Sequence, residues 1–122
     1  MYGKVNRTLA NNHNEVNVII IDDSKDLKYA HSARLGDKGT QHDGYCETVI
    51  IAGSPTVFID GLPAARTGDP LTPHARPEHP PHPRKIAGGS ATVFIDGLPA
   101  ARTGDAVDCG GVVIGSSTVN IG

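Results

Sequence analysis

The sequence predicts an all-β fold: a small closed body of short β-hairpins with internal pseudo-threefold symmetry, whose connecting loops converge at one end. Two observations support this prediction. The 122 residues include 15 Gly and 9 Pro, which indicates many turns and few long helices. In addition, residues 54–69 recur as residues 90–105 with a single difference, Pro55 against Ala91. Only an internal repeat explains so close a match.

Each copy of the repeat is expected to form a β-hairpin. Thr-Val-Phe-Ile has the alternation of a strand, Asp-Gly is the preferred two-residue type I′ turn, and Leu-Pro-Ala-Ala-Arg runs back. Pro63 and Pro99 cannot donate to a ladder, so the return arms should be short and lie at an edge. Asp60 and Asp96 occupy the turns, and turn chemistry explains them better than catalysis does.

Two partial copies flank the full ones. Residues 33–37 match the end of the repeat, and residues 115–121 match its start. If these halves pair, they form a third hairpin and close a ring of three equivalent units with few open edges. We therefore predict one repeat domain over residues 31–122, preceded by an N-terminal extension over residues 1–30.

The extension is expected to be an arm packed along the body. It holds a candidate strand over residues 15–21 and a charged stretch over residues 22–28. The longest apolar run, residues 18–21, is too short for a signal-peptide core or a membrane span. The formal net charge of −2 and the scattered Lys and Arg argue against a nucleic-acid partner.

Three loops join the hairpins: residues 38–52, 70–88 and 106–114. Because the hairpins are equivalent, all three loops should emerge at the same end, opposite the Asp-Gly turns. The second loop, PLTPHARPEHPPHPRKIAG, is so rich in proline that a helix is excluded and an extended, polyproline-like conformation is expected. We predict that it forms a stiffened loop at the apex.

The chemical signal is a cluster of His and Cys in these loops, which hold four of the six His and both Cys. Each unit offers one such residue four or five positions after its closing Asp, so three side chains should converge on the axis: His42, His74 and Cys109. A fourth, His79 or His82, would complete a tetrahedral site, for which zinc fits best and iron is the alternative. In an extended segment these two His lie roughly 9 Å apart, so only one is expected to bind.

Two alternatives for the cysteines stay open. Cys46 competes with His42, because counting back from Gly-Ser aligns Cys46 with His82. A disulfide between Cys46 and Cys109 is the oxidised alternative. An enzyme is not expected, because a catalytic zinc keeps an open coordination position near a general base, whereas four protein ligands would fill the shell.

The repeated motif resembles the PAAR repeat, named for the Pro-Ala-Ala-Arg that stands here at residues 63–66 and 99–102. The match covers residues 33–122. The resemblance implies a small cone that caps the trimeric spike of contractile injection systems, namely phage tails, type VI secretion systems and related extracellular particles. It also implies an apex sharpened by a zinc ion held by three His and one Cys.

The resemblance bears on the fourth ligand as well. Family members often carry His-x-Cys-Pro-x-His-Gly in the second apical loop, and residues 74–80 here, HARPEHP, keep both His and the Pro. This favours His79. Arg76 replaces the Cys, Pro80 replaces the Gly, and extra residues including His82 follow, so the choice stays open. The predicted metal site is His42, His74, His79 and Cys109, with His82 and Cys46 as alternates.

As a spike tip, the protein would be made in the bacterial cytoplasm, assembled into a phage tail baseplate or a secretion particle, and delivered outward. Its partner would be a homotrimeric β-helical spike with one tip per trimer, because a pseudo-threefold monomer offers each spike chain a near-identical surface. Contact with the target membrane would be transient, during puncture of the cell envelope. The residues expected against the spike flank the Asp-Gly turns: Ile59, Leu62, Ile95 and Leu98. A free-standing metal-binding adaptor and a metal-dependent enzyme are the alternative functions.

Overall fold

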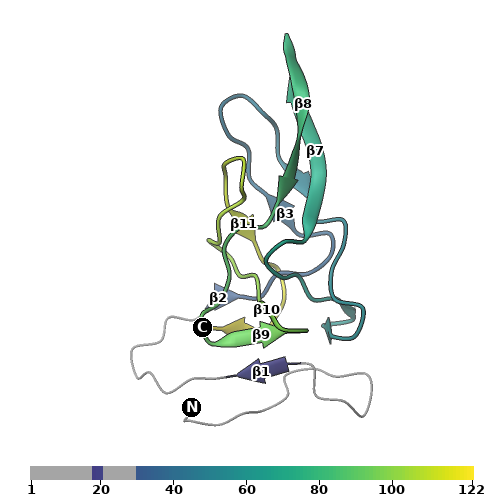
Figure 1. Cartoon of the computed structure of the whole chain (residues 1–122), viewed down its shortest axis with the longest axis vertical. Helices are drawn as coiled ribbons and strands as arrows, with labels where there is room; N and C mark the ends of the chain where they lie inside the picture. The colour runs from purple at the N-terminus through teal and green to yellow at the C-terminus, as the bar shows by residue number, and fades with distance from the viewer. Residues whose placement is uncertain (1–17, 21–29) are drawn as a thin grey trace.

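In the computed structural model, which describes residues 18–20 and 30–122, the chain tapers from a broad base to a narrow apex (Figure 1). The described residues form short strands and no helix, as the repeat predicts. The strands are β1 (Val18–Ile20), β2 (Ala30–His31), β3 (Lys38–Gly39), β4 (Thr48–Val49), β5 (Phe58–Ile59), β6 (Leu62–Pro63), β7 (Pro70–Arg76), β8 (His79–Lys85), β9 (Val93–Ile95), β10 (Leu98–Pro99), β11 (Val113–Ile114) and β12 (Asn120–Ile121). Nothing helical within these ranges is long and apolar enough to cross a membrane.

The two full repeats form the predicted hairpins. β5 pairs with β6, and β9 pairs with β10, both antiparallel. The turn of the first hairpin has φ of 51° at Asp60 and 83° at Gly61, and the second has 52° and 80° at the equivalent Asp-Gly. Positive φ at both turn residues is what a type I′ turn requires, so the dipeptide sets the local structure.

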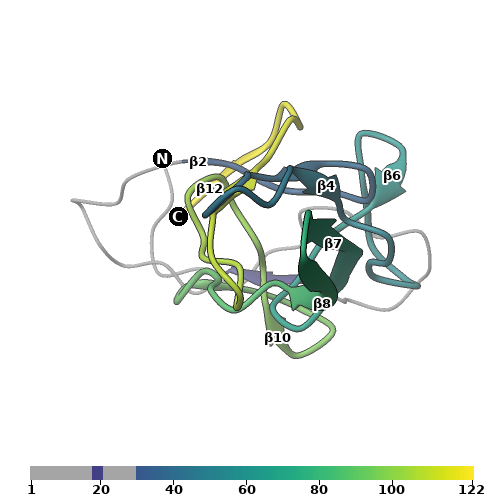
Figure 2. The ribbon, with the colours of Figure 1, turned by 90° about the horizontal axis from the view of Figure 1, so that it is seen from above.

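The third hairpin comes from the two flanking half-repeats. β2 pairs with β12, with His31 opposite Asn120 and Ala30 opposite Ile121. The ring of three units is therefore closed by segments from opposite ends of the repeat region, as predicted. Figure 2 shows β6, β10 and the β2–β12 pair on three different sides of the body.

A ring of backbone hydrogen bonds runs between the units at their second repeated alanine. The amide of Ala33 donates to Ala101 at 2.9 Å, that of Ala65 donates to Ala33 at 2.9 Å, and that of Ala101 donates to Ala65 at 3.0 Å. All three residues are completely buried. Alanine suits this position because interiors are close-packed, and three larger side chains would collide where the units meet.

The tail of each unit is closed by the same short contact. A carboxylate oxygen of the closing Asp accepts a hydrogen bond from the backbone N–H of the Arg three residues earlier, at 2.7 to 2.8 Å. These pairs are Arg34–Asp37, Arg66–Asp69 and Arg102–Asp105. The three apical loops therefore all start from the same geometry.

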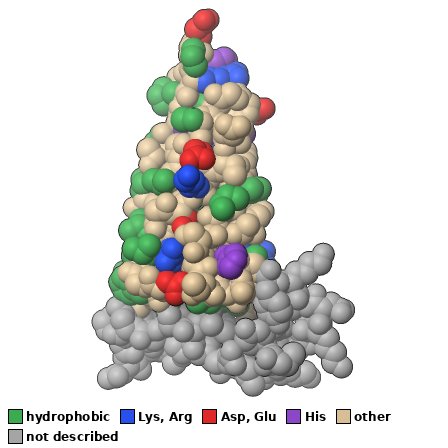
Figure 3. Space-filling view, turned by 180° about the vertical axis from the view of Figure 1, so that it is seen from behind, with side chains coloured by type: hydrophobic (Ala, Val, Ile, Leu, Met, Phe, Trp, Pro, Cys, Tyr) green, Lys and Arg blue, Asp and Glu red, His purple; other side chains and the backbone are tan. Residues whose placement is uncertain are grey.

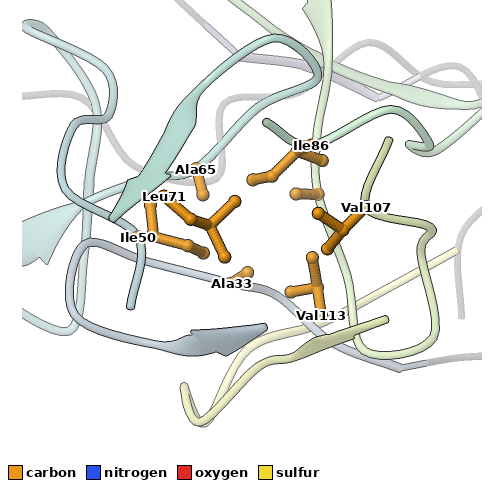
Figure 4. Packing of buried hydrophobic residues seen from close by; sticks show 8 residues of the cluster. Ala33, Ile50, Ala65, Leu71, Ile86, Val107 and Val113 are labelled. Atoms are coloured by element: carbon orange, nitrogen blue, oxygen red, sulfur yellow. The ribbon is translucent and has the colours of Figure 1, made fainter. Parts of the chain in front are cut away.

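Two layers of small aliphatic side chains make the core. The lower layer contains residues of the hairpins: Val57, Ile59, Ala64, Val93, Ile95, Ala100 and Ile121. The upper layer lies beneath the apical loops (Figure 4) and contains Ala33, Ile50, Ala65, Leu71, Ile86, Ala101, Val107 and Val113. The buried members of both layers are Ala, Val, Ile and Leu only.

The proline-rich second loop is a β-hairpin rather than an isolated extended segment. β7 and β8 pair antiparallel, with irregularities in register on both sides of His74. They form the long projection at the top of Figure 1. Proline is tolerated because Pro70 begins β7, and the other prolines of the two strands lie between the paired residues, at the irregularities in register. The prediction of a non-helical loop at the apex is confirmed, but the loop is a pair of strands rather than a single extended segment.

The first and third apical loops are joined by a sheet of order β11-β3-β4. Lys38 of β3 faces Val49 of β4 on one side and Ile114 of β11 on the other. The backbone thus fixes the two loops against each other before any side chain at the apex is considered.

Part of the N-terminal arm reaches the base. β1 pairs antiparallel with the free edge of β9, so the sheet order is β1-β9-β10. The predicted strand over residues 15–21 is thus found over Val18–Ile20. The rest of that strand and the charged stretch over residues 22–28 lie outside the described residues.

Candidate metal centre

Four metal-ligating side chains meet below the tip of the β7–β8 hairpin. Their ligand atoms all lie within 4.8 Å of one another, and they come from all three apical loops. The members are His42, His74, His82 and Cys109. His74 and His82 are cross-strand partners in the hairpin, whereas His42 and Cys109 belong to the first and third loops.

The four ligand atoms are grouped closely around one point, with separations that fall on both sides of those in a tetrahedral site. The Nε2 atoms of His42 and His74 are 3.0 Å apart, those of His74 and His82 are 2.5 Å apart, and the Cys109 Sγ is 3.7 Å from His74 Nε2. Ligands at about 2.0 to 2.3 Å from a tetrahedral ion stand roughly 3.3 to 3.6 Å apart. Lone pairs of imidazole nitrogens this close repel unless a proton or a cation lies between them, so this donor set fits a metal ion.

His74 is held in the tautomer that a metal ligand needs. Its Nδ1 lies 2.6 Å from the carbonyl oxygen of Cys46, and because a carbonyl only accepts, Nδ1 carries the proton and Nε2 presents its lone pair to the group. Burial lowers the pKa of His74 below its usual value, and the charge of Arg84 and the imidazoles of His82 and His42 lower it further. The ring is therefore neutral at pH 7.

A small hairpin in the first loop places His42. The backbone N–H groups of His42 and Tyr45 each donate to the other residue's carbonyl, at 3.0 and 2.7 Å. Between them, Asp43 and Gly44 have φ of 45° and 84°, a third type I′ Asp-Gly turn. The same dipeptide signal that identified the repeat hairpins was present here and predicts this turn as well.

Tyr45 covers the outer side of the centre, a role that the sequence analysis missed. Its ring centroid lies 4.3 Å from that of His82, 4.9 Å from that of His74 and 5.3 Å from that of His42. The guanidinium of Arg76 lies over the tyrosine ring at 5.0 Å. An aromatic cover of this kind limits the access of water to the ligands. No spacing rule for metal ligands would have singled out a tyrosine.

The structure brings His82 into the centre and leaves His79 out. His79 pairs with Arg76 one step closer to the tip and is exposed, whereas His82 pairs with His74. The preference for His79 followed the family's motif spacing, but in this hairpin His79 pairs with Arg76, and the alternate His82 lies among the other three candidate ligands. Cys46 contributes only its carbonyl oxygen, and its exposed thiol is free, as is that of Cys109.

The four residues predicted to face the spike separate into two pairs. Ile59 and Ile95 are 2% and 1% exposed and belong to the lower core layer. Leu62 and Leu98, at equivalent positions of the two return arms, are 39% and 40% exposed. Of these four residues, the two leucines offer apolar surface, because the alternation along each hairpin directs its isoleucine inward.

Comparisons with known proteins agree with the repeat. A comparison with curated proteins found no match. The family model of the PAAR motif matches residues 35–115, which include both full copies of the repeat and all four residues of the candidate centre. Because this match covers well over half of the 122 residues, the chain belongs to the PAAR-motif family.

Proposed function

We propose that the protein is the metal-stabilised tip of a trimeric spike in a contractile injection machine, such as a phage tail or a secretion particle. The observation that carries the proposal is the His3Cys group at the point where three equivalent loops meet near the apex of a tapering body. The PAAR motif indicates a structural role at the tip of a spike. A pseudo-threefold monomer suits a threefold partner because each partner chain meets an equivalent unit.

We assign zinc to the centre, held by His42, His74, His82 and Cys109. Three imidazoles and one thiolate are a ligand set typical of closed structural zinc sites. When bound, the ion would supply four bonds that join the three apical loops, and structural zinc contributes roughly 10 to 16 kcal/mol in small domains. Loops that bury little apolar surface would then resist bending when the tip is driven against an envelope.

Elemental analysis of the purified protein tests this assignment. The wild-type chain should hold close to one zinc or iron per molecule, and the double variant His74→Ala/Cys109→Ala should hold none. The matched control is His79→Ala/Cys46→Ser, which also changes one His and one Cys of the apical loops but spares the four candidate ligands. A wild-type protein purified without metal, or a control that loses its metal, contradicts the assignment.

We place the spike-binding surface at the base, around the exposed Leu62 and Leu98. These leucines follow the Asp-Gly turns of two units and so occupy equivalent places around the axis, whereas the equivalent residue of the third unit is Ala30. A charged side chain at both positions should abolish binding, because burying an unpaired carboxylate costs several kcal/mol.

The binding experiment uses a homotrimeric β-helical spike protein from the same genome. The wild-type tip should co-purify with it at one tip per three spike chains, and Leu62→Glu/Leu98→Glu should not. Ile51→Glu is the control, because Ile51 is 51% exposed but lies in an apical loop. Full metal content without any spike binding would instead support a free-standing metal-binding adaptor.

The tapered face shown in Figure 3 fits passage through an envelope rather than residence in it. On this face Lys and Arg side chains alternate with Asp and Glu, and apolar side chains are scattered between them. Transient contact with a membrane, followed by onward movement, is what such a mixed surface would favour.

A further inference from the structure

Arg84 is a buried cation directly beneath the metal centre, and neither the repeat nor the metal ligands account for it. It lies in β8 and is 2% exposed, so it is one of the largest fully buried side chains of the described residues. Arginine is almost never buried to this extent without a partner. Yet none of the ion pairs found among residues 18–20 and 30–122 includes Arg84.

Every N–H of the guanidinium nevertheless has an acceptor. Nε donates to the Sγ of Cys109 at 3.3 Å. Nη1 donates to the carbonyl of Gly39 at 3.1 Å and to the hydroxyl of Thr48 at 3.0 Å. Nη2 donates to the carbonyls of Thr40 at 2.8 Å and Gly110 at 3.0 Å. A guanidinium has five N–H groups, so its hydrogen-bonding capacity is filled.

These acceptors belong to the other two apical loops. Gly39, Thr40 and Thr48 lie in the first loop, and Cys109 and Gly110 lie in the third. Arg84 itself belongs to the second loop. The Arg84 side chain therefore joins all three apical loops. The four candidate metal ligands, which come from the same three loops, would join them in the same way.

Arg84 also departs from the threefold symmetry, because the equivalent positions of the other two units hold different residues. The amides of Ile50, Ile86 and Val113 donate to the carbonyl of the closing Asp in their respective units, at 2.8 to 2.9 Å, so these three positions are equivalent. The residues two positions earlier in the three units are therefore also equivalent, and they are Thr48, Arg84 and Gly111. Three equivalent arginines could not share this space, and the repeat places only one.

Two glycines lie against the guanidinium, although the nearest group that a Cβ would meet is a Leu71 methyl at Gly39, 2.4 Å away, and the Thr40 carbonyl oxygen at Gly111, 2.6 Å away. A Cβ at Gly39 would lie 3.3 Å from Arg84 Nη1, and a Cβ at Gly111 would lie 3.1 Å from Nη2. Both contacts are tighter than ordinary van der Waals distance. Small residues in the first and third units therefore match one large residue in the second.

We propose that Arg84 is a positioning residue that assembles the three apical loops and fixes the Cys109 sulfur within the ligand group before any metal binds. The part of this inference that concerns the sulfur rests on the proposed metal centre. The part that concerns the loops does not, because the four oxygen acceptors of Arg84 are independent of any ion.

Hydrogen exchange of chelator-treated, metal-free protein tests the loops. Arg84→Met keeps an unbranched side chain, although a shorter one, and removes all five hydrogen bonds. The amides of Gly110 and Val112, which donate to Val107 and to the Thr40 hydroxyl, should then lose about ten- to hundredfold of their protection, as expected when buried hydrogen bonds to a charged group are lost. The amides of Ala33 and Ala65, which belong to the ring of backbone hydrogen bonds between the three units, should keep their protection. Every amide should keep its protection in the control Lys85→Met. Unchanged protection at Gly110 and Val112 would overturn the proposal.

Two milder variants cover the case in which Arg84→Met does not fold. Arg84→Lys keeps the charge, but an ammonium group cannot reach five acceptors, so it should lose protection as the Met variant does. Thr48→Val removes one acceptor and should give a smaller loss at the same amides. If Arg84→Lys shows the full wild-type protection, a positive charge alone is enough to hold the loops, and the proposed role of the five hydrogen bonds is refuted.

Cobalt substitution tests the sulfur. In Arg84→Lys the sulfur-to-cobalt charge-transfer band should weaken or shift, and cobalt should leave for a chelator about tenfold faster, because outer partners of a ligand typically change metal affinity by about 10- to 100-fold. A band identical to that of the wild type would show that Arg84 does not position the sulfur. If the wild-type protein binds no cobalt, the metal centre itself is wrong, while the exchange experiment still decides the role of Arg84 in the loops.

Discussion

His82 and His79 stand three residues apart on β8, and the structure gives them different surroundings. The Nε2 of His82 lies 2.5 Å from that of His74, whereas His79 is exposed nearer the tip. Because zinc sites with four protein ligands contribute roughly 10 to 16 kcal/mol, one ligand accounts for about 3 kcal/mol. At 1.4 kcal/mol per factor of ten, His82→Ala should weaken zinc binding roughly a hundredfold.

The same loss should appear in the thermal stability. At saturating zinc for the wild-type protein, a hundredfold weaker site loses about 2.7 kcal/mol of the stabilisation that the metal gives. For a domain of this size, that lowers the midpoint of thermal unfolding by roughly 10 to 20 °C. Without zinc, His82→Ala and wild type should unfold within a few degrees of each other.

The assay is a competition titration against a chromophoric chelator, together with thermal unfolding in the presence and absence of zinc. His79→Ala is the matched control and should resemble the wild type in both measurements. If His79→Ala weakens binding as much as His82→Ala, or if His82→Ala binds zinc like the wild type, the reasoning from strand register is refuted.

Three further predictions concern the fold and the pH response. Gly39→Ala should lower the free energy of unfolding by about 1 to 3 kcal/mol in chemical denaturation, because its Cβ would lie 2.4 Å from a methyl group of Leu71; wild-type stability would show that the upper layer is loosely packed. Asp96→Ala should lower the free energy of unfolding by about 1 to 2 kcal/mol, because this carboxylate accepts a part-buried hydrogen bond from the Ser54 hydroxyl at 2.5 Å and pairs with Arg66 of the same repeat as Ser54 at 3.1 Å, and an unchanged denaturation midpoint would contradict those contacts. Because burial lowers the pKa of His74 in the folded state, its contribution to the stability of metal-free protein should be complete above pH 6.5 and be lost as the pH falls below that value; a His74→Ala variant with the same pH dependence would contradict this.

Predicting the ring from the sequence was possible because the repeat is local chemistry copied twice. An Asp-Gly turn imposes positive φ wherever it occurs, so the two copies had to fold alike. The half-repeats at residues 33–37 and 115–121 carry the same pattern, and that pattern identified them as partners although about eighty residues separate them. Equivalent positions also brought His42, His74 and Cys109 toward one axis.

What the sequence left open depended on strand register and on packing. Along the chain, His79 and His82 are both at distances from His74 that would allow either to be a ligand. Only the irregular pairing of β7 with β8 sets His82 opposite His74. Register is set by all the contacts of a hairpin together, including two irregularities that no local rule anticipates. In the same way, the inward direction of Ile59 and Ile95 emerged only when the lower layer was assembled.

Arg84 shows the division most clearly. As a sequence feature it is one basic residue in a proline-rich loop, and composition alone places such a residue on the surface. Its five acceptors come from residues 39–48 and 109–110, which are far from it along the chain. The sequence by itself determined the repeat, the hairpins and three of the four candidate ligands, because these follow from local turn chemistry and equivalence. The tertiary structure decided which second histidine of the hairpin joins the candidate cluster and where Arg84 is buried, because both depend on which distant groups the closed ring brings together.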